Sequence, residues 1–339
     1  MQAAISTYLK GAVCGFAAVS IWSGWSVVTR LAVTTDLNAL DIVALRFGVA
    51  GVILSPVILR RGLALERLGS FGLAGIIAGL GAPYALVAAE GLRYAPAYDA
   101  GALNPAVMPL FVSLIAAVAL GEKRSTVGKC GLSLILVGAL VISGWHAEGW
   151  GESCDGWRVF GDALFLSAAF LTACGTVIMR QAKLDPLHAA ALVSCGSLVI
   201  YLPIYLVFRG THLSQLPLAD LAVHATFQGV LVTVVALVLY GRAVAALGAS
   251  AGAAFGALVP ALTALLAIPL LAEWPGEADW AAIVLISAGV YLASNGPLRG
   301  RKQQEGPCAG INGLSAVATA PSNHWRRRTC PIGRGLEKS

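Results

Sequence analysis

The chain has 339 residues, of which 58% are hydrophobic and only 12% are charged, and its mean hydropathy is +0.78. Soluble domains carry about 25% charged residues, so this composition excludes an ordinary soluble protein. The net charge of +6 does not indicate nucleic acid as a partner, because basic cytoplasmic loops explain it in a membrane protein. The seven cysteines form no CxxC pair and no metal-ligand spacing, so neither a disulfide framework nor a metal site is predicted.

Apolar runs of roughly 18–25 residues, long enough to cross a bilayer as helices, follow one another along the chain. Lipid offers the backbone no hydrogen-bond partners, so each run is predicted to be a helix. The first run follows Lys10 and is too long for a signal-peptide core, which favours an uncleaved first helix. The sequence predicts an all-α membrane protein with ten transmembrane helices, near residues 9–33, 41–59, 69–90, 96–120, 128–145, 159–180, 187–208, 221–242, 247–272 and 279–296.

After Pro297 the chain becomes polar, glycine-rich and basic. Such a segment cannot bury a core, so residues 299–339 are predicted to be a disordered basic tail. The run Arg326–Arg328 could touch anionic lipid, although a plain soluble tail is the favoured interpretation.

The distribution of basic residues orients the predicted helices. If the N-terminus is cytoplasmic, thirteen lysines and arginines fall on the inner side and five on the outer side. Inner loops are enriched in lysine and arginine. We therefore expect a multi-pass protein of the plasma (bacterial inner) membrane with both termini in the cytoplasm.

The chain contains an internal repeat. When residues 95–143 are shifted by 151 positions onto residues 246–294, fourteen of 49 positions are identical, including Pro109/Pro260, Glu122/Glu273 and Gly138/Gly289. Each half would hold five helices, an odd number, so the halves would enter the membrane in opposite directions. We expect two inverted five-helix repeats, at residues 1–147 and 148–298, an architecture typical of secondary transporters with a substrate site near the midplane.

The fourth and ninth predicted helices carry the first candidate site residues. A proline inside a helix frees the carbonyl four residues earlier, and in lipid a freed carbonyl is tolerated against protein or a water-filled cavity. Two interpretations stay open: a broken helix that lines a polar cavity, with Asn104 binding substrate, or a kink that lets helices cross. The helix-break or gating candidates are Gly101, Pro105, Pro109, Gly252, Gly256 and Pro260.

Further substrate-binding candidates lie in other predicted helices. Interfacial tryptophans belong at helix ends, whereas Trp22 and Trp25 lie midway along the first helix, so they form either an aromatic substrate wall or ordinary packing. Most charged residues within the predicted helices lie near enough to an end to snorkel, so each is either an anchor or a ligand. Arg46 is the most deeply placed of them and the one best suited to an anionic group or a gating ion pair. Tyr84 and Phe255 complete the set. Acidic residues are absent from the middle of every predicted helix, which weighs against exchange through a central carboxylate.

These residues resemble the EamA-type transporters of the drug/metabolite transporter superfamily. The resemblance covers about residues 9–297 and rests on Trp22 with Arg30, on Arg46-Phe47, and most specifically on Gly91–Lys123, echoed at Ala246–Glu273. It implies ten helices in two inverted repeats, a central cavity, and export of small metabolites such as amino acids. The run from Trp22 to Trp25 and the presence of Asp99 and Asn104-Pro105 depart from the family pattern, so the substrate of another member does not transfer.

The sequence therefore predicts a secondary transporter that exports small metabolites by alternating access. The alternatives are efflux of hydrophobic cationic drugs, or a non-transporting membrane enzyme or scaffold built around loop 146–158. No catalytic or metal-binding motif occurs, so no enzyme activity, metal or cofactor is predicted. The expected partners are a small-molecule metabolite and the lipid bilayer. A proton or another coupling ion, and a homodimer, stay open.

Overall fold

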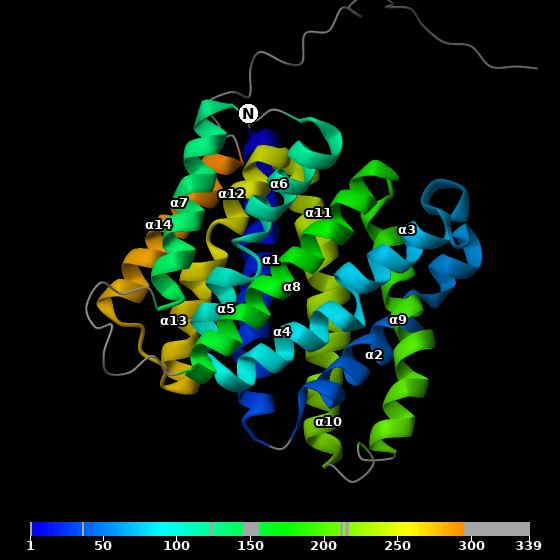
Figure 1. Ribbon diagram of the computed structural model, residues 1–339. Helices are drawn as coiled ribbons and strands as arrows, with labels where there is room; N and C mark the ends of the chain where they lie inside the picture. The colour runs from blue at the N-terminus through cyan, green and yellow to red at the C-terminus, as the bar shows by residue number, and fades with distance from the viewer. Residues whose placement is uncertain are drawn as a thin grey trace, which may run out of the picture. The chain divides into compact units, whose positions relative to one another are not determined.

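The computed structural model describes residues 2–35, 37–122, 125–144, 156–210, 213 and 217–294 (Figure 1). The predicted tail and most of loop 146–158 lie outside these residues. Within the described ranges the chain is helical and contains no strand. The prediction of an all-helical protein is therefore confirmed.

The first half of the chain forms seven helices. Their ends agree with the predicted ranges to within a few residues, except that α1 starts earlier. Side-chain caps explain two of the starts: Asn38 accepts a hydrogen bond from the Asp41 backbone N–H, and Ser125 accepts one from the Gly128 backbone N–H, which satisfies donors that a helix leaves unpaired. The helices are α1 Gln2–Val33, α2 Ala39–Arg61, α3 Leu65–Leu80, α4 Ala82–Tyr94, α5 Ala97–Leu103, α6 Met108–Leu120 and α7 Thr126–Ile142.

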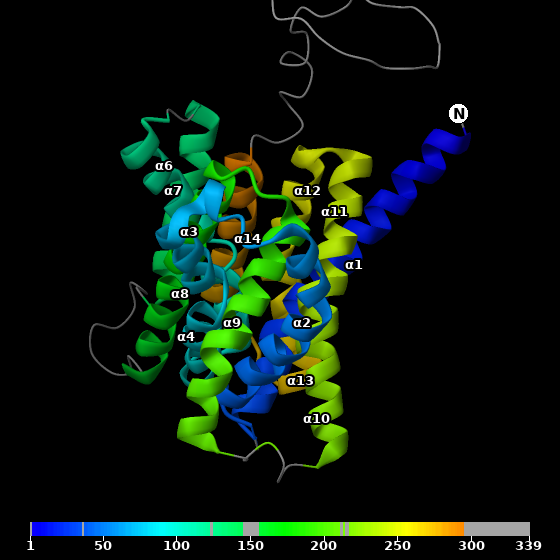
Figure 2. The same ribbon diagram turned by 90° about the vertical axis from the view of Figure 1, so that its right-hand side faces the viewer.

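The second half repeats this order. A π-helix, η2, lies in the middle of its third long helical segment, between α10 and α11, and the three form one continuous rod (Figure 2). The elements are α8 Gly156–Gln181, α9 Pro186–Arg209, α10 Leu218–His224, η2 Ala225–Val235, α11 Ala236–Leu247, α12 Ala249–Gly256, α13 Val259–Leu271 and α14 Glu277–Ala293.

Eight helical segments of the described chain are long and apolar enough to cross a membrane. A ninth, Thr126–Ile142, is apolar but shorter, and α14 has 17 residues. Since a helix needs about 20 residues to cross the hydrocarbon layer without tilt or thinning, the count of ten transmembrane helices stays a prediction.

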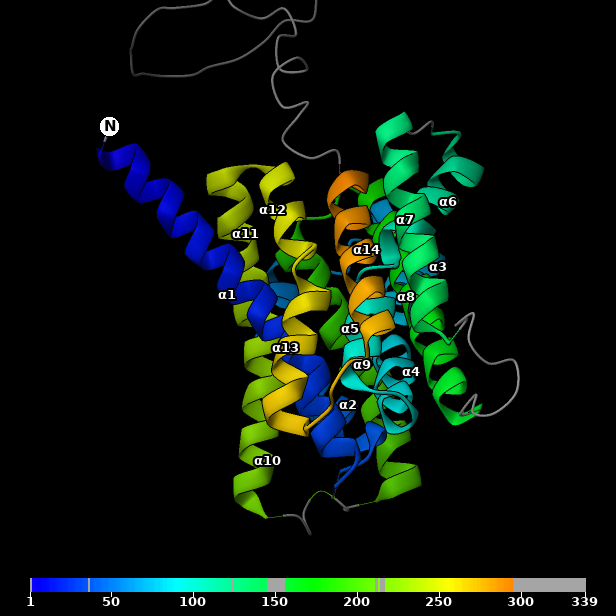
Figure 3. The ribbon, with the colours of Figure 1, turned by 90° about the vertical axis from the view of Figure 1, so that its left-hand side faces the viewer.

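Helices of one half pack against their counterparts in the other half. Figure 3 shows α7 beside α14, and their glycines let the two backbones touch. A Cβ at Gly289 would lie 2.7 Å from the Gly131 carbonyl oxygen, and one at Gly138 would lie 3.0 Å from the Ala282 carbonyl oxygen. A shift of 151 residues exchanges these two contacts, so the repeat in the sequence is also a reciprocal contact in the structure.

Ion pairs between the halves show a similar reciprocity, at shifts of 144 and 148 residues. At the two ends of the antiparallel pair α2 and α9 (Figure 2), Asp41 pairs with Arg209 at 3.3 Å and Asp185 with Arg61 at 3.0 Å. Each pair joins the start of one helix to the end of the other, where the charges also match the helix dipoles. Each half thus contributes one helix to an antiparallel pair that is held together at both ends.

The α7–α14 contact gives a stability prediction. We expect Gly289→Ala to lower the stability of the purified protein by about 1–3 kcal/mol, because the added methyl group meets rigid backbone. Gly48→Ala in α2 is the matched control, since a Cβ there meets nothing within 4 Å, and it should be neutral or stabilising. Thermal unfolding in detergent measures both variants. Equal melting temperatures would show that α7 and α14 are not packed this closely.

Candidate substrate cavity

A cavity of about 190 Å³ lies inside the helical bundle. Residues from α1, α2, α4, the α5–α6 connection, η2 and α13 line it, so both halves of the chain contribute. The lining residues are Trp22, Trp25, Ser26, Arg46, Tyr84, Asn104, Pro105, Val232 and Val259. Five of the six substrate-binding candidates from the sequence lie together here, and Pro105 joins them.

A break in the fourth helical segment, between α5 and α6, forms part of the cavity wall. The helix ends at Leu103, residues 104–107 form a turn, and α6 begins at Met108. Pro109 lies in the first turn of α6 and not at a kink within one helix. Proline is favoured in the first turn, because the N–H that it lacks would have no partner within the helix there. The break leaves Asn104 buried, 4% exposed, with its Nδ2 3.4 Å from the Tyr84 hydroxyl. It places an amide and a hydroxyl on the cavity wall.

The same break occurs in the second half, between α12 and α13, where Pro260 lies in the first turn of α13. The Val259 carbonyl at this break accepts hydrogen bonds from Ser23 at 3.3 Å and from Thr263 at 2.9 Å. The Ser23 hydroxyl on α1 is thereby hydrogen-bonded to the start of α13, directly after the break.

Arg46 supplies the charge of the cavity. It is half-buried, its Nε is buried without a hydrogen-bond partner, and it forms no ion pair with any residue that the structure describes. The guanidinium carbon lies 5.7 Å from the Trp25 ring centre and 5.5 Å from the Phe47 ring centre. Two aromatic faces hold the cation in place and leave its donors available to a ligand.

Two tryptophans form the aromatic part of the wall. Trp22 donates a hydrogen bond to the Val232 carbonyl at 3.4 Å and packs on the Tyr240 ring at 5.1 Å. Trp25 is 7% exposed, and its Nε1 is buried without a partner. A buried indole N–H usually finds an acceptor, so Trp25 offers an unused donor beside Arg46.

The remaining sequence candidates lie away from this cavity. Phe255 packs on Gly15 of α1, Gly101 on Thr263 of α13, and Gly252 on Val244 and Tyr240 of α11. Gly256 has open space around it. Phe255 and Asn104 are equivalent positions of the repeat, yet only Asn104 lines the cavity.

Sequence reasoning missed Ser26, Val232 and Val259. Ser26 and Val259 are ordinary residues of apolar helices, and nothing in their spacing marks them. Val232 lies in η2, and π-helical turns often occur at functional sites, but no sequence signal placed one here.

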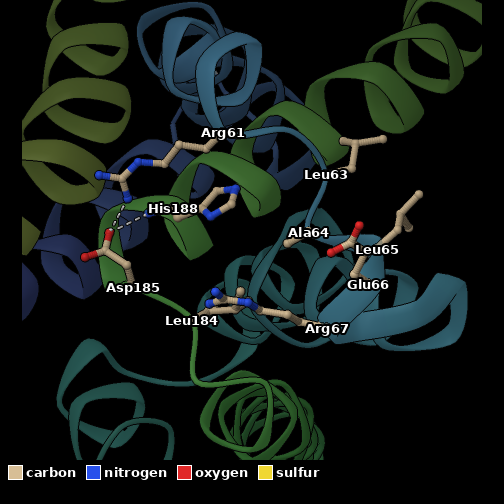
Figure 4. A pocket seen from close by; sticks show the side chains of 9 residues that line it. All are labelled: Arg61, Leu63, Ala64, Leu65, Glu66, Arg67, Leu184, Asp185 and His188. Atoms are coloured by element: carbon tan, nitrogen blue, oxygen red, sulfur yellow. Dashed lines mark hydrogen bonds and ion pairs between the residues drawn. The ribbon is translucent and has the colours of Figure 1, made fainter. Parts of the chain in front are cut away.

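A larger hollow, about 780 Å³, lies among the connections of α2 to α3 and of α8 to α9 (Figure 4). Two of its charged side chains pair with each other, since Arg61 lies 3.0 Å from Asp185. The His188 Nε2 lies 2.9 Å from the Gly62 carbonyl. The pKa of the Asp185 carboxyl is lowered, chiefly because the His188 backbone N–H donates to it and then because of Arg61. These groups are exposed, so the hollow is a surface groove rather than a second buried site.

No group of three or more histidine, cysteine, aspartate or glutamate side chains in the described part of the chain is arranged to hold a metal ion. The polar atoms of the cavity belong to an arginine, an amide, hydroxyls and indoles, which are hydrogen-bonding groups for an organic molecule.

Comparison with known proteins decides the family. The model of the EamA-like transporter family matches residues 9–144 and 159–295, one copy in each half. The chain belongs to the EamA-like transporter family. As a member of this transporter family with several apolar helices, the protein is a multi-pass membrane protein, and its two family units confirm the resemblance that the sequence indicated.

A solved structure titled "Crystal structure of protein" shares the fold of this EamA-like chain. It is 22% identical, with a TM-score of 0.54, over 84% of this chain and 96% of the other. No curated protein matches the chain.

Proposed function

We propose that this EamA-like protein exports a small organic metabolite that carries a carboxylate or another anionic group, by alternating access around the central cavity. Its ten helices form two inverted repeats of five, at residues 1–147 and 148–298. It resides in the bacterial inner membrane with both termini and the 299–339 tail in the cytoplasm. The cavity opens alternately to the cytoplasmic side, where it binds the substrate, and to the outer side, where it releases it.

The observation that supports this proposal most directly is the unpaired guanidinium of Arg46 in the cavity wall. An arginine inside a membrane protein is costly unless something compensates its charge. The planar guanidinium can donate two parallel hydrogen bonds to the two oxygens of one carboxylate. An anionic substrate group supplies that compensation while it is bound. The same positive charge disfavours the alternative of cationic drugs.

The other lining groups fit a small amino-acid-like molecule. Asn104 and Tyr84 provide an amide and a hydroxyl, and Trp22 and Trp25 provide flat apolar faces. Ligand sites typically combine such apolar walls with a few placed polar groups. The cavity of about 190 Å³ is smaller than the roughly 300–1,000 Å³ of drug-sized sites, which favours a metabolite over a bulky drug.

An untargeted comparison of culture media tests the export proposal. Cells that express the protein should accumulate a few small anionic or zwitterionic metabolites outside, compared with cells that carry an empty vector. Cells expressing Arg46→Ala at the same level are the matched control and should resemble the empty vector. Unchanged media, in cells where the protein is correctly inserted, would contradict export.

Asn104→Ala should alter substrate selectivity or rate without affecting insertion. The substitution removes the hydrogen bond to Tyr84 and one polar contact with substrate, for which we expect a loss of about 0.5–1.5 kcal/mol in binding. Intrinsic tryptophan fluorescence, to which Trp22 and Trp25 contribute among the eight tryptophans of the chain, can follow binding of the metabolites found in the medium. Identical affinities and selectivity for wild type and variant would remove Asn104 from the site.

A further inference from the structure

A second cluster of charged side chains lies where α5, α8 and α14 meet, at the same end of the bundle as the end of α1. It contains Asp99 on α5, Arg158 and Asp162 on α8, and Asp279 in the first turn of α14. The three aspartates are 0%, 2% and 6% exposed. Burial of several carboxylates is costly unless each is paired or protonated, so the partner of each carboxylate matters.

Two of the three carboxylates are compensated. Arg158 donates to both oxygens of Asp99, at 2.8 and 3.1 Å, and to Asp279 at 3.1 Å. Asp279 also accepts the Gly276 backbone N–H at 2.9 Å and lies at the start of α14, where the helix dipole favours a negative charge. The Tyr98 ring lies 5.7 Å from the Arg158 guanidinium and covers one side of it.

Asp162 has no such partner. Both of its oxygens are buried, and no donor of the described residues reaches either of them. Arg158, four residues before Asp162 and on the same face of α8, binds the Asp99 carboxylate at 2.8 Å. The carboxyl groups of Asp99 and Asp162 are therefore neighbours. Two ionised carboxylates cannot donate to each other and repel, whereas one proton turns the contact into a hydrogen bond.

The other charged groups around this cluster are already paired. The titratable and charged groups that face it are Tyr98 and Asp99 from α5, Arg158 from α8, Asp279 from α14, and Glu273 from the connection before α14. Helix α4, which packs on α8, carries Glu90 and Arg93 near its end. Glu273 is neutralised by Arg30 at 3.0 Å, and Glu90 by Arg93 at 2.9 Å. Neither pair supplies a charge to Asp162.

We infer that Asp162 and Asp99 together bind one proton, and that this proton couples to the opening of this end of the protein. The inference rests on the proposed transport function and names its coupling ion. Arg158 occupies the space between Asp99 and Asp279, where a metal cation would have to lie, so a proton fits the cluster better. The repeat does not copy the cluster, because Ser250 and Gly128 stand at the positions equivalent to Asp99 and Asp279.

The coupling follows from the position of Arg158 one turn before Asp162 on α8. While Asp162 holds the proton, it donates to Asp99, and Arg158 ties α5 to α14. When water enters at this end, the Asp162 O–H bond breaks and its proton passes to water. The new carboxylate then attracts Arg158, four residues away on the same helix face, and weakens the Arg158 contacts with Asp99 and Asp279. Protonation therefore favours the closed end and deprotonation the open end.

Infrared difference spectroscopy of the purified protein in lipid nanodiscs tests the proton site without any substrate. A shift from acidic to alkaline pH should remove the band of a protonated carboxylic acid in the wild type. Asp162→Asn should lose this band, and Glu90→Gln, a substitution at the same end, should keep it. A band that persists in Asp162→Asn, or that sodium rather than pH removes, would overturn the inference.

A second variant, Asp99→Asn, tests the same site independently in case Asp162→Asn does not fold. Asp99→Asn frees Arg158 to pair with Asp162, so the protonated band should also disappear there; its persistence would contradict the shared site. The transport function is tested separately, since metabolite release that is identical in wild type and Asp162→Asn and independent of a pH gradient would overturn proton coupling and leave the exporter proposal intact.

Discussion

Replacing Arg46 by alanine is expected to abolish export while leaving the protein folded. Each hydrogen bond to a charged group contributes about 1.5–3 kcal/mol, which corresponds to a loss of roughly 10- to 100-fold in binding for one lost contact and more for a bidentate one. The folded state loses little, because Arg46 forms no ion pair with any described residue. The lost contacts with the Trp25 and Phe47 rings are offset by removal of a charge that is unfavourable within the membrane. Metabolite release and thermal unfolding, measured on one preparation, check both parts.

Two further substitutions separate charge from geometry at this position. Arg46→Lys keeps the positive charge but loses the planar fork of donors, so export should be reduced and not abolished. Arg60→Ala removes an exposed arginine near the end of the same helix and should leave export unchanged. If Arg46→Ala lowers the melting temperature by as much as it lowers export, Arg46 is a packing residue and the substrate assignment is wrong.

The sequence could predict the helices and the repeat because both depend on local patterns. Apolar runs of membrane-crossing length fix where helices form, and the identities at Pro109/Pro260 and Gly138/Gly289 reveal the duplication. Positions inside helices that break the expected pattern, such as Trp22, Trp25 and Arg46, also pointed to the cavity, since neither interfacial tryptophans nor arginines are expected there.

The sequence could not predict which residues meet across the two halves. Arg30 and Glu273 are 243 positions apart, and no spacing rule joins residues on different helices. Asn104 and Phe255 are equivalent in the repeat, but Asn104 lines the cavity and Phe255 packs against α1. Similarity of sequence between the two repeats does not require equivalent residues to contact equivalent neighbours. Asp162 lies near the start of α8, and only the packing of α5 and α14 shows that it is buried.

Replacing Glu273 by glutamine is expected to open one end of the transporter. The Glu273 carboxylate accepts Arg30 Nε at 3.0 Å and the Ala97 backbone N–H at 2.8 Å, and Arg30 also donates to the Leu92 carbonyl. One side chain therefore ties α1 and the start of α5 to the connection between α13 and α14. Arg30 and Glu273 side chains are 20% and 16% exposed, so solvent screens the pair only in part.

Glu122→Gln at the opposite end is the matched control. Glu122 is the repeat counterpart of Glu273 and pairs with Arg180, but these side chains are 43% and 45% exposed, so their pair should contribute little. For Glu273→Gln, a shift of about 1–2 kcal/mol would change the population of the open state roughly 5- to 30-fold. Glu122→Gln should change it far less.

Labelling of a single cysteine at Ser26, a residue of the cavity wall that is 4% exposed, measures this population. The seven native cysteines are first replaced, and a membrane-impermeant thiol reagent is added to intact cells and to inverted vesicles. Glu273→Gln should speed labelling from the side at which α1 ends and slow it from the other side, because one cavity cannot open to both sides at once in alternating access. Faster labelling from both sides would show a loosened structure instead of a gate, and no change from either side would show that the Arg30–Glu273 pair does not hold the cavity closed.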